Sequence, residues 1–163
     1  MKIDINDPGK ILDIASKLPP DVAKEFTKTY FKIQELDKKG NIKKDFMSFV
    51  KHVWPDFIEG SHHKRIANIF NRIAEGKLKR LIINMPPRHT KSEFASFLFP
   101  AWMVGRNPKL KIIQSTNTTE LSVRFGRKAK QLMDDPLYKE VFDTRLREDS
   151  QAAGKWETEQ GGE

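Results

Sequence analysis

Hydrophobic residues recur at helical spacing over most of this chain, and two short apolar runs interrupt that pattern. The spacing predicts helices over residues 9–17, 21–39, 45–54, 61–75, 91–103 and 121–134. The two exceptions are Arg80-Leu-Ile-Ile-Asn-Met85 and Leu110-Lys-Ile-Ile-Gln-Ser115, and each predicts a strand. Strand, loop, helix and strand in that order make a βαβ unit, which requires a parallel sheet with a right-handed crossover.

The loop between the first apolar run and the next helix carries candidate phosphate chemistry. Pro86-Pro-Arg-His-Thr-Lys-Ser-Glu93 contains the Lys-Ser pair that ends the pattern G-x-x-x-x-G-K-[ST]. In that pattern backbone N–H groups cradle phosphate, the lysine reaches the β- and γ-phosphates, and the hydroxyl ligates Mg²⁺. The sequence therefore assigns Lys91 to the phosphates, Ser92 to Mg²⁺, and the amides from His89 to Ser92 to the cradle.

Met85 and Thr90 occupy the two glycine positions of the pattern, and these departures change the expected loop. A β-branched residue resists positive φ, so we expect an adapted loop in which Thr90 is unstrained. Pro86 and Pro87 remove two N–H donors, and a bidentate contact from Arg88 would offset that loss. The structural alternative is a strand, a turn and a helix with a solvated Arg-His-Thr-Lys tip.

This loop, the strand before it and Phe94-Ala-Ser-Phe-Leu-Phe-Pro-Ala-Trp102 after it resemble the ATPase motor of the tailed-bacteriophage terminase large subunit. The likeness extends from about residue 49 to residue 163. It includes His62-His63-Lys64, Asn107-Pro-Lys-Leu-Lys-Ile-Ile-Gln114, Leu121-Ser-Val-Arg-Phe-Gly-Arg-Lys128 and Gly154-Lys-Trp-Glu-Thr158. The resemblance implies a P-loop ATPase that binds ATP and Mg²⁺ and drives double-stranded DNA into a procapsid.

The resemblance also implies partners and a location. These are the portal protein, the small terminase subunit, a homo-oligomeric assembly of the full-length protein, and the cytoplasm of the infected host cell. The family's Walker B acidic pair, its trans-acting arginine and its nuclease domain would follow residue 163. We therefore expect this chain alone to bind nucleotide weakly without useful turnover.

The expected organisation is a helical N-terminal appendage, residues 1–41, followed by the N-terminal part of a P-loop ATPase domain, residues 42–163. The predicted fold class is α/β, with an incomplete parallel sheet core of the P-loop NTPase type. A length of 163 residues suits one domain of this kind and leaves no room for a nuclease domain.

Two further groups of residues are candidates for function. In the terminase family the segment before the phosphate loop lies beside the adenine, which makes Phe57, His62 and His63 candidates there; packing or helix-start polarity is the alternative. One side of the helix after Glu120 is basic, and it could contact DNA or a neighbouring subunit, or be a solvated face. Its candidate residues are Arg124, Arg127 and Lys128.

The composition of the chain indicates which class of partner it binds. The net charge of +8 favours a polyanion, because lysine and arginine neutralise phosphates and release counterions. The chain has no cysteine, no long apolar run and no signal-peptide core, so we expect an intracellular protein without a membrane partner. Two alternatives remain: a helicase or translocase motor on the same core, and a basic DNA-binding module that does not use nucleotide.

Overall fold

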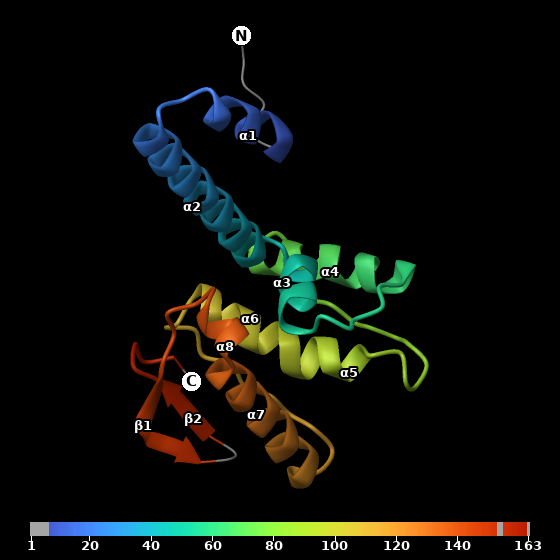
Figure 1. Ribbon diagram of the computed structural model, residues 1–163. Helices are drawn as coiled ribbons and strands as arrows, with labels where there is room; N and C mark the ends of the chain where they lie inside the picture. The colour runs from blue at the N-terminus through green and yellow to red at the C-terminus, as the bar shows by residue number, and fades with distance from the viewer. Residues whose placement is uncertain (1–6, 153–154, 163) are drawn as a thin grey trace. The chain divides into compact units, whose positions relative to one another are not determined.

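The computed structural model describes residues 7–152 and 155–162, and their packing defines two units (Figure 1). The first unit is Met1–Gly40 and the second is Asn41–Glu163. Helix α2, Pro20–Lys44, crosses the boundary between them. Among the described residues, no helix combines the length and the apolar character needed to cross a bilayer.

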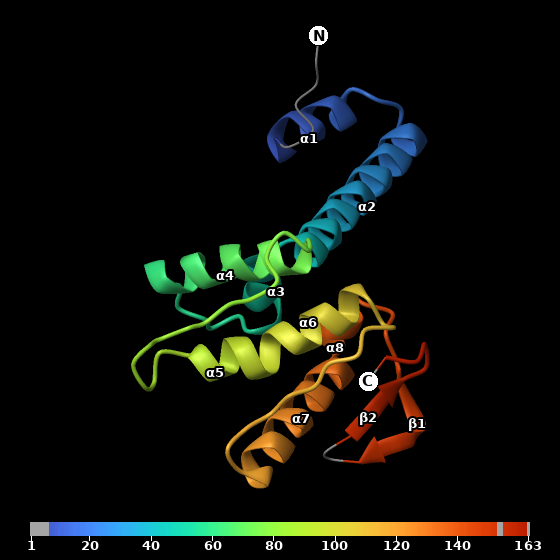
Figure 2. The same cartoon turned by 180° about the vertical axis from the view of Figure 1, so that it is seen from behind.

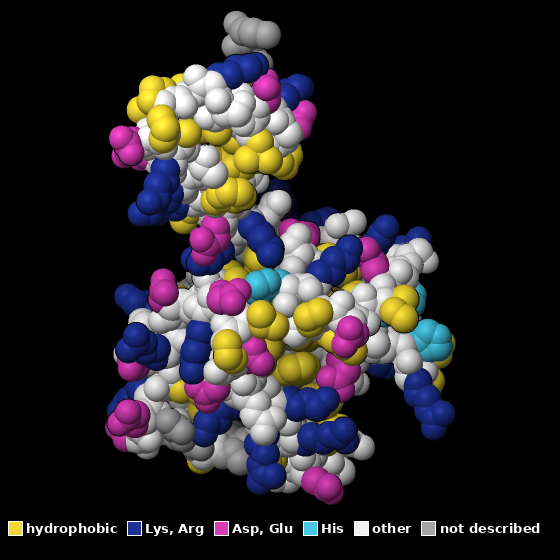
Figure 3. Space-filling model, viewed as in Figure 1, with side chains coloured by type: hydrophobic (Ala, Val, Ile, Leu, Met, Phe, Trp, Pro, Cys, Tyr) yellow, Lys and Arg dark blue, Asp and Glu magenta, His cyan; other side chains and the backbone are white. Residues whose placement is uncertain are grey.

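The first unit consists of helix α1, Pro8–Ser16, and most of α2. The Asp7 carboxylate caps α1 by accepting the backbone N–H groups of residues 9 and 10, which have no partner inside the helix. Ile11 and Tyr30 are buried, whereas Phe31 and Leu36 expose 61% and 59% of their surface. Figure 3 shows apolar side chains, in yellow, on the face of this unit that is turned to the viewer.

The second unit packs helices around a core of aromatic side chains (Figures 1 and 2). In chain order these helices are α3 (Phe46–Val53), α4 (Ser61–Ala74), α5 (Lys91–Glu93), the π-helix η1 (Phe94–Leu98), α6 (Phe99–Arg106), α7 (Thr119–Asp134) and α8 (Pro136–Lys139). Helices α5, η1 and α6 follow one another without a gap. Both views show this continuous helix between α3–α4 and α7.

Hydrogen bonds from buried polar groups join these helices. The Asn71 side chain of α4 accepts the Phe46 backbone N–H at 2.8 Å and donates to Asp45 at 2.7 Å, which fixes the start of α3. The Trp102 indole donates to the Ile42 carbonyl at 3.0 Å. Tyr138 donates to the Ala101 carbonyl, and because burial raises the pKa of its phenol the donor proton is retained.

The wide turn η1 has a local cause in Pro100. Proline has no N–H, and in a regular α-helix its ring would clash with the carbonyl one turn earlier, that of Ser96. The π turn instead joins the Phe99 N–H to the Phe94 carbonyl, and the helix continues to Arg106. The loop at Lys91 therefore sits on a long helix that proline has not interrupted.

The predicted parallel sheet is absent from the described residues, so the predicted P-loop NTPase fold class is wrong. The described strands are β1, Leu146–Ala152, and β2, Lys155–Thr158, which pair antiparallel with Leu146 opposite Thr158. These strands lie in a polar stretch where no apolar periodicity predicted them. The chain is mainly helical, with this two-stranded sheet at its C-terminal end.

Neither of the two runs predicted as strands forms a strand among the described residues. Burial alternates along residues 80–85 and 110–115, with Leu81, Ile83 and Ile112 packed against the core. In Figure 2 the segment between α4 and α5 and the segment between α6 and α7 run in the same direction. Strands in a sheet lie about 4.8 Å apart, so a strand needs a neighbouring backbone as well as alternating side chains. The sequence pattern predicted the alternation but could not predict the neighbour.

The outward faces of these segments should make the chain self-associate. Ile82 and Ile113 expose 87% and 98% of their surface on extended backbone, a combination that favours edge-to-edge pairing. We expect the double variant Ile82→Lys/Ile113→Lys to be more monomeric than the parent in sedimentation velocity. Ile58→Lys/Leu36→Lys is the matched control, because it adds the same two charges at residues that are 88% and 59% exposed and lie outside both segments. An equal effect of the control would show that net charge, and not these edges, governs association.

Candidate phosphate-binding loop

The candidate site is the loop that joins the first extended segment to α5. Pro86 and Pro87 end the extended segment, a tight turn follows, and the helix begins at Lys91. The backbone N–H of Phe94 donates to the Thr90 carbonyl at 2.9 Å, which is the first hydrogen bond of the continuous helix. The loop therefore delivers Lys91 and Ser92 to the exposed N-terminal end of a helix.

The backbone of the loop is left-handed at two residues that are not glycine. Arg88 has a φ of 64° and Thr90 a φ of 58°. The expectation of an unstrained Thr90 is therefore wrong. A β-branched residue in this region costs roughly 1–2 kcal/mol, so surrounding contacts must hold it there.

The Thr90 hydroxyl makes the contacts that hold it. Its Oγ1 donates to the His89 carbonyl at 2.7 Å and lies 2.6 Å from Nε2 of His63. Because the hydroxyl proton is already used, Nε2 of His63 must donate. The other ring nitrogen, Nδ1, accepts the Gly60 backbone N–H at 2.9 Å, which requires the same neutral tautomer.

His63 is enclosed by aromatic rings. It is 6% exposed, and its ring centroid lies 4.8 Å from that of Phe57 and 5.2 Å from that of Phe94. Burial lowers the pKa of His63, and the neighbouring His62 lowers it further, while Glu59 opposes the shift and His89 adds to it. The neutral ring is thus the favoured form.

The three residues expected beside adenine, Phe57, His62 and His63, lie close to the candidate loop. Phe57 contacts Phe94 as well as His63, so it packs against the continuous helix formed by α5, η1 and α6. The rings of His62 and His63 have centroids 3.8 Å apart, and His62 lies 5.9 Å from His89. The structure therefore brings both histidines to the loop itself. No three metal-ligating side chains of the described residues are grouped as a metal site.

The polar side chains of the loop have few partners. Lys91 turns back, and its Nζ donates to the Met85 carbonyl at 3.3 Å. His89 Nδ1 donates to the Pro87 carbonyl at 2.9 Å. Arg88 and Ser92 are exposed. The lysine ammonium consequently lies across the base of the loop, between the end of the extended segment and the start of the helix.

The three basic candidates on α7 differ from one another. Lys128 is paired with Glu93, at 2.7 and 2.8 Å from the two carboxylate oxygens, and its ammonium lies 5.5 Å from the Phe97 ring. This ion pair connects α7 to α5, at the start of the continuous helix. Arg124 and Arg127 are exposed on the same helix. On the face shown in Figure 3, basic and acidic side chains are interspersed.

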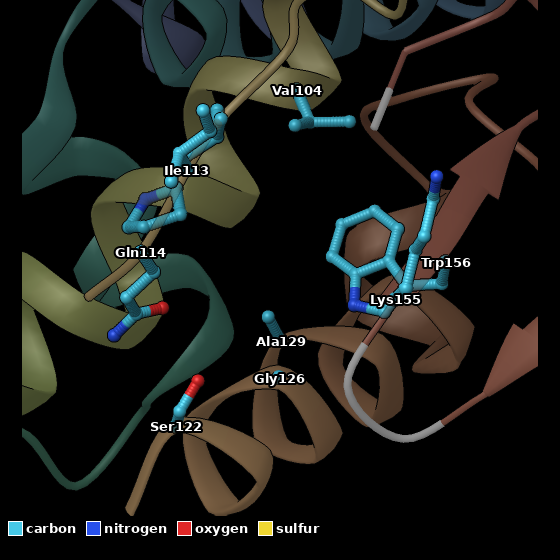
Figure 4. Close-up of a pocket in the computed structure, with 10 residues that line it drawn as sticks. Val104, Ile113, Gln114, Ser122, Gly126, Ala129, Lys155 and Trp156 are labelled. Carbon is cyan, nitrogen blue, oxygen red and sulfur yellow. The ribbon is translucent and has the colours of Figure 1, made fainter. Parts of the chain in front are cut away.

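A separate cavity of about 260 Å³ lies between α6, α7, β2 and the second extended segment (Figure 4). Val104 and Trp156 contribute apolar walls, and Ser122 and Gln114 contribute polar groups. Nε2 of Gln114 is buried and has no hydrogen-bond partner among the described residues. The cavity does not reach Lys91 or Ser92, which are absent from its lining.

Sequence reasoning missed two contributors to this site. Gly60 supplies the N–H that orients His63, and Glu93 binds Lys128. The glycine three positions before a histidine at a helix start was a usable signal for the first contact. The second joins residues 35 positions apart and has no local signature.

Strain at Thr90 can be measured with a pair of variants. Thr90→Gly and Thr90→Ala both lose the hydroxyl, but only alanine keeps a Cβ at positive φ. We expect the glycine variant to be more stable than the alanine variant by about 1 kcal/mol in urea unfolding. At negative φ the order would reverse, because glycine loosens the unfolded chain. A more stable alanine variant would therefore contradict the left-handed conformation.

Comparisons of the chain with protein-family models, with curated proteins and with solved structures gave no match.

Proposed function

We propose that the loop over residues 86–92 binds the phosphates of ATP together with Mg²⁺. The observation that carries this proposal is the backbone of Thr90. It stands where the pattern G-x-x-x-x-G-K-[ST] has its second glycine, and its φ of 58° is a conformation that glycine adopts readily. The lysine that follows it turns its ammonium back to the Met85 carbonyl, beside the backbone that would hold the phosphates.

The chemistry of the loop suits a phosphate group. The backbone N–H groups of Lys91, Ser92 and Glu93 begin the continuous helix, and they make no backbone hydrogen bond within the described residues. Such amides, with the positive end of the helix dipole, favour an anion. Two of the preceding residues are prolines and donate nothing, so the exposed Arg88 would supply a further contact.

Each side chain has a definite role in this proposal. Lys91 would bind the β- and γ-phosphates, Ser92 would ligate Mg²⁺, and Arg88 would make a second phosphate contact. Bound Mg²⁺ would neutralise phosphate charge. The amides from His89 to Ser92 would form the cradle, while His63 and Phe57 support it from beneath.

The biological role that we propose is the ATP-binding part of a viral DNA-packaging motor of the terminase large-subunit kind. It is supported by the resemblance around Lys91-Ser92 and by the net charge of +8, which suits a DNA partner. The portal protein, the small terminase subunit and further copies of the full-length protein are the other proposed partners, in the cytoplasm of the infected cell. The exposed Arg124 and Arg127 are the proposed contacts to DNA or a neighbouring subunit.

Calorimetric titration with Mg²⁺ and the non-hydrolysable analogue AMP-PNP tests the proposal. We expect Lys91→Ala to weaken binding by about tenfold to a hundredfold, because charge-assisted hydrogen bonds contribute roughly 1.5–3 kcal/mol. Lys28→Ala is the control, since it removes the same charge from an exposed position on α2. Unchanged affinity in folded Lys91→Ala would refute the phosphate role of Lys91. No nucleotide binding, with equal DNA affinity in its presence and absence, would favour the basic DNA-binding module.

A further inference from the structure

We propose that His63 is a positioning residue of the phosphate loop. Its Nε2–H holds Thr90 in the left-handed conformation, and so sets the geometry of the amides that follow. The effect on nucleotide affinity rests on the proposed function of the loop. The effect on the loop backbone does not, and the two can be measured separately.

The hydrogen bond of 2.6 Å between His63 and Thr90 connects α4 to a loop 27 residues away. Thr90 is the only described residue besides Arg88 that is not glycine and has a positive φ. Its hydroxyl is anchored on one side by its own neighbour, the His89 carbonyl, and on the other by His63. Of these two contacts, only the one to His63 ties the loop to another element.

The ring of His63 is itself immobilised, as a positioning group must be. Both nitrogens are used, Nδ1 by the Gly60 N–H and Nε2 by Thr90, so one tautomer satisfies both bonds. Phe57 and Phe94 pack against the ring, and Phe94 is the first residue of η1, directly after α5. The ring therefore sets the distance between the start of α4 and the loop.

The charged and titratable groups around the ring do not reach Thr90 in its place. Glu59, His62 and His89 act on His63 electrostatically. None of the three has a side-chain hydrogen bond to the Thr90 hydroxyl among the described residues. Removing the donor of His63 should thus leave the threonine without a contact outside its own loop.

Two isosteric substitutions separate the two bonds of the ring. In His63→Gln the amide nitrogen lies near the position of Nε2 and can still donate to Thr90. In His63→Asn the amide oxygen lies near the position of Nδ1 and can still accept from Gly60, while the donor to Thr90 is lost. Thr90→Val removes the hydroxyl and keeps the shape of the side chain.

We expect His63→Gln to bind Mg·AMP-PNP within about twofold of the parent, and His63→Asn and Thr90→Val each to bind about tenfold more weakly. The double variant His63→Asn/Thr90→Val should be no weaker than Thr90→Val alone, because Thr90→Val already removes the interaction that His63→Asn removes. Equal losses in His63→Gln and His63→Asn, or additive losses in the double variant, would overturn the proposal.

A nucleotide-free measurement decides the outcome if binding is absent or a variant is unstable. The φ of residue 90, determined by NMR couplings, should be positive in the parent and in His63→Gln. It should leave that region in His63→Asn, which loses the donor to Thr90, and in Thr90→Val, which alters only a partly exposed side chain. If φ follows the His63 contact but AMP-PNP does not bind, the proposed function fails and the positioning role stands. If φ is unchanged when the contact is lost, the positioning role fails even where nucleotide binds.

Discussion

The purified chain is expected to bind Mg·ATP and yet to release phosphate no faster than its Lys91→Ala variant. Phosphoryl transfer needs an acid at Mg²⁺, a group that orients the attacking water, and often an arginine finger, which alone contributes about 10³–10⁵ in rate. Lys91 and Ser92 would supply only the binding part of that machinery.

Three carboxylates that could be considered as the acid at Mg²⁺ already have other partners in the structure. Glu93, which follows the Lys-Ser pair, is paired with Lys128. Asp134 pairs with Lys139, and Asp135 caps α8 by accepting the Leu137 N–H at 2.8 Å. These contacts fit structural roles, so none of the three is expected to serve as the acid at Mg²⁺.

A phosphate-release assay with and without double-stranded DNA measures this turnover, with Lys91→Ala reporting any contaminating ATPase. DNA-stimulated phosphate release that disappears in Lys91→Ala would contradict the expectation. It would show that a catalytic acid lies within these residues, and Glu93→Gln would then be the first variant to assay.

Phe46→Ala is expected to destabilise the second unit by about 3–5 kcal/mol. Phe46 is fully buried, and its ring centroid lies 5.2 Å from that of Phe70, 5.4 Å from that of Trp102 and 5.5 Å from that of Phe94. Removing the ring leaves a cavity among three helices. A loss of this size is a large part of the roughly 5–15 kcal/mol that stabilises a typical domain.

Urea unfolding followed by tryptophan fluorescence measures the effect, since Trp102 is one of the neighbours of Phe46. The control is Phe31→Ala, which removes the same side chain where it is 61% exposed. We expect that control to change the free energy of unfolding by less than about 1 kcal/mol. Similar losses in the two variants would show that Phe46 is not at the centre of the core.

Local signals in the sequence predicted the helices well. Asp45 and Pro55 bracket α3, Gly60 precedes α4, and the cap-rich stretch before Glu120 opens α7. These boundaries depend on residues within one turn of each helix end, so the sequence carries them directly. The strands β1 and β2 were missed because their polar residues have no apolar alternation.

The candidate loop shows the same division between local and distant causes. The sequence predicted that the loop lies between an apolar run and a helix. It also predicted that Arg88, Lys91 and Ser92 belong to this loop. The sign of φ at Thr90 could not, because intrinsic preference favours a negative value and the distant His63 stabilises the other conformation. The pairing of Glu93 with Lys128 likewise depends on how α7 packs against η1.

The sequence by itself determined the longer helices of this protein, the two apolar runs between them, and the place where a basic loop meets a helix. It did so because spacing, capping and proline act within a few residues. The tertiary structure alone decided that residues 80–85 and 110–115 form no strand among the described residues, since a strand forms a sheet only where another backbone lies beside it. It also decided the left-handed Thr90, since a strained backbone persists only where contacts from distant residues such as His63 over-determine it.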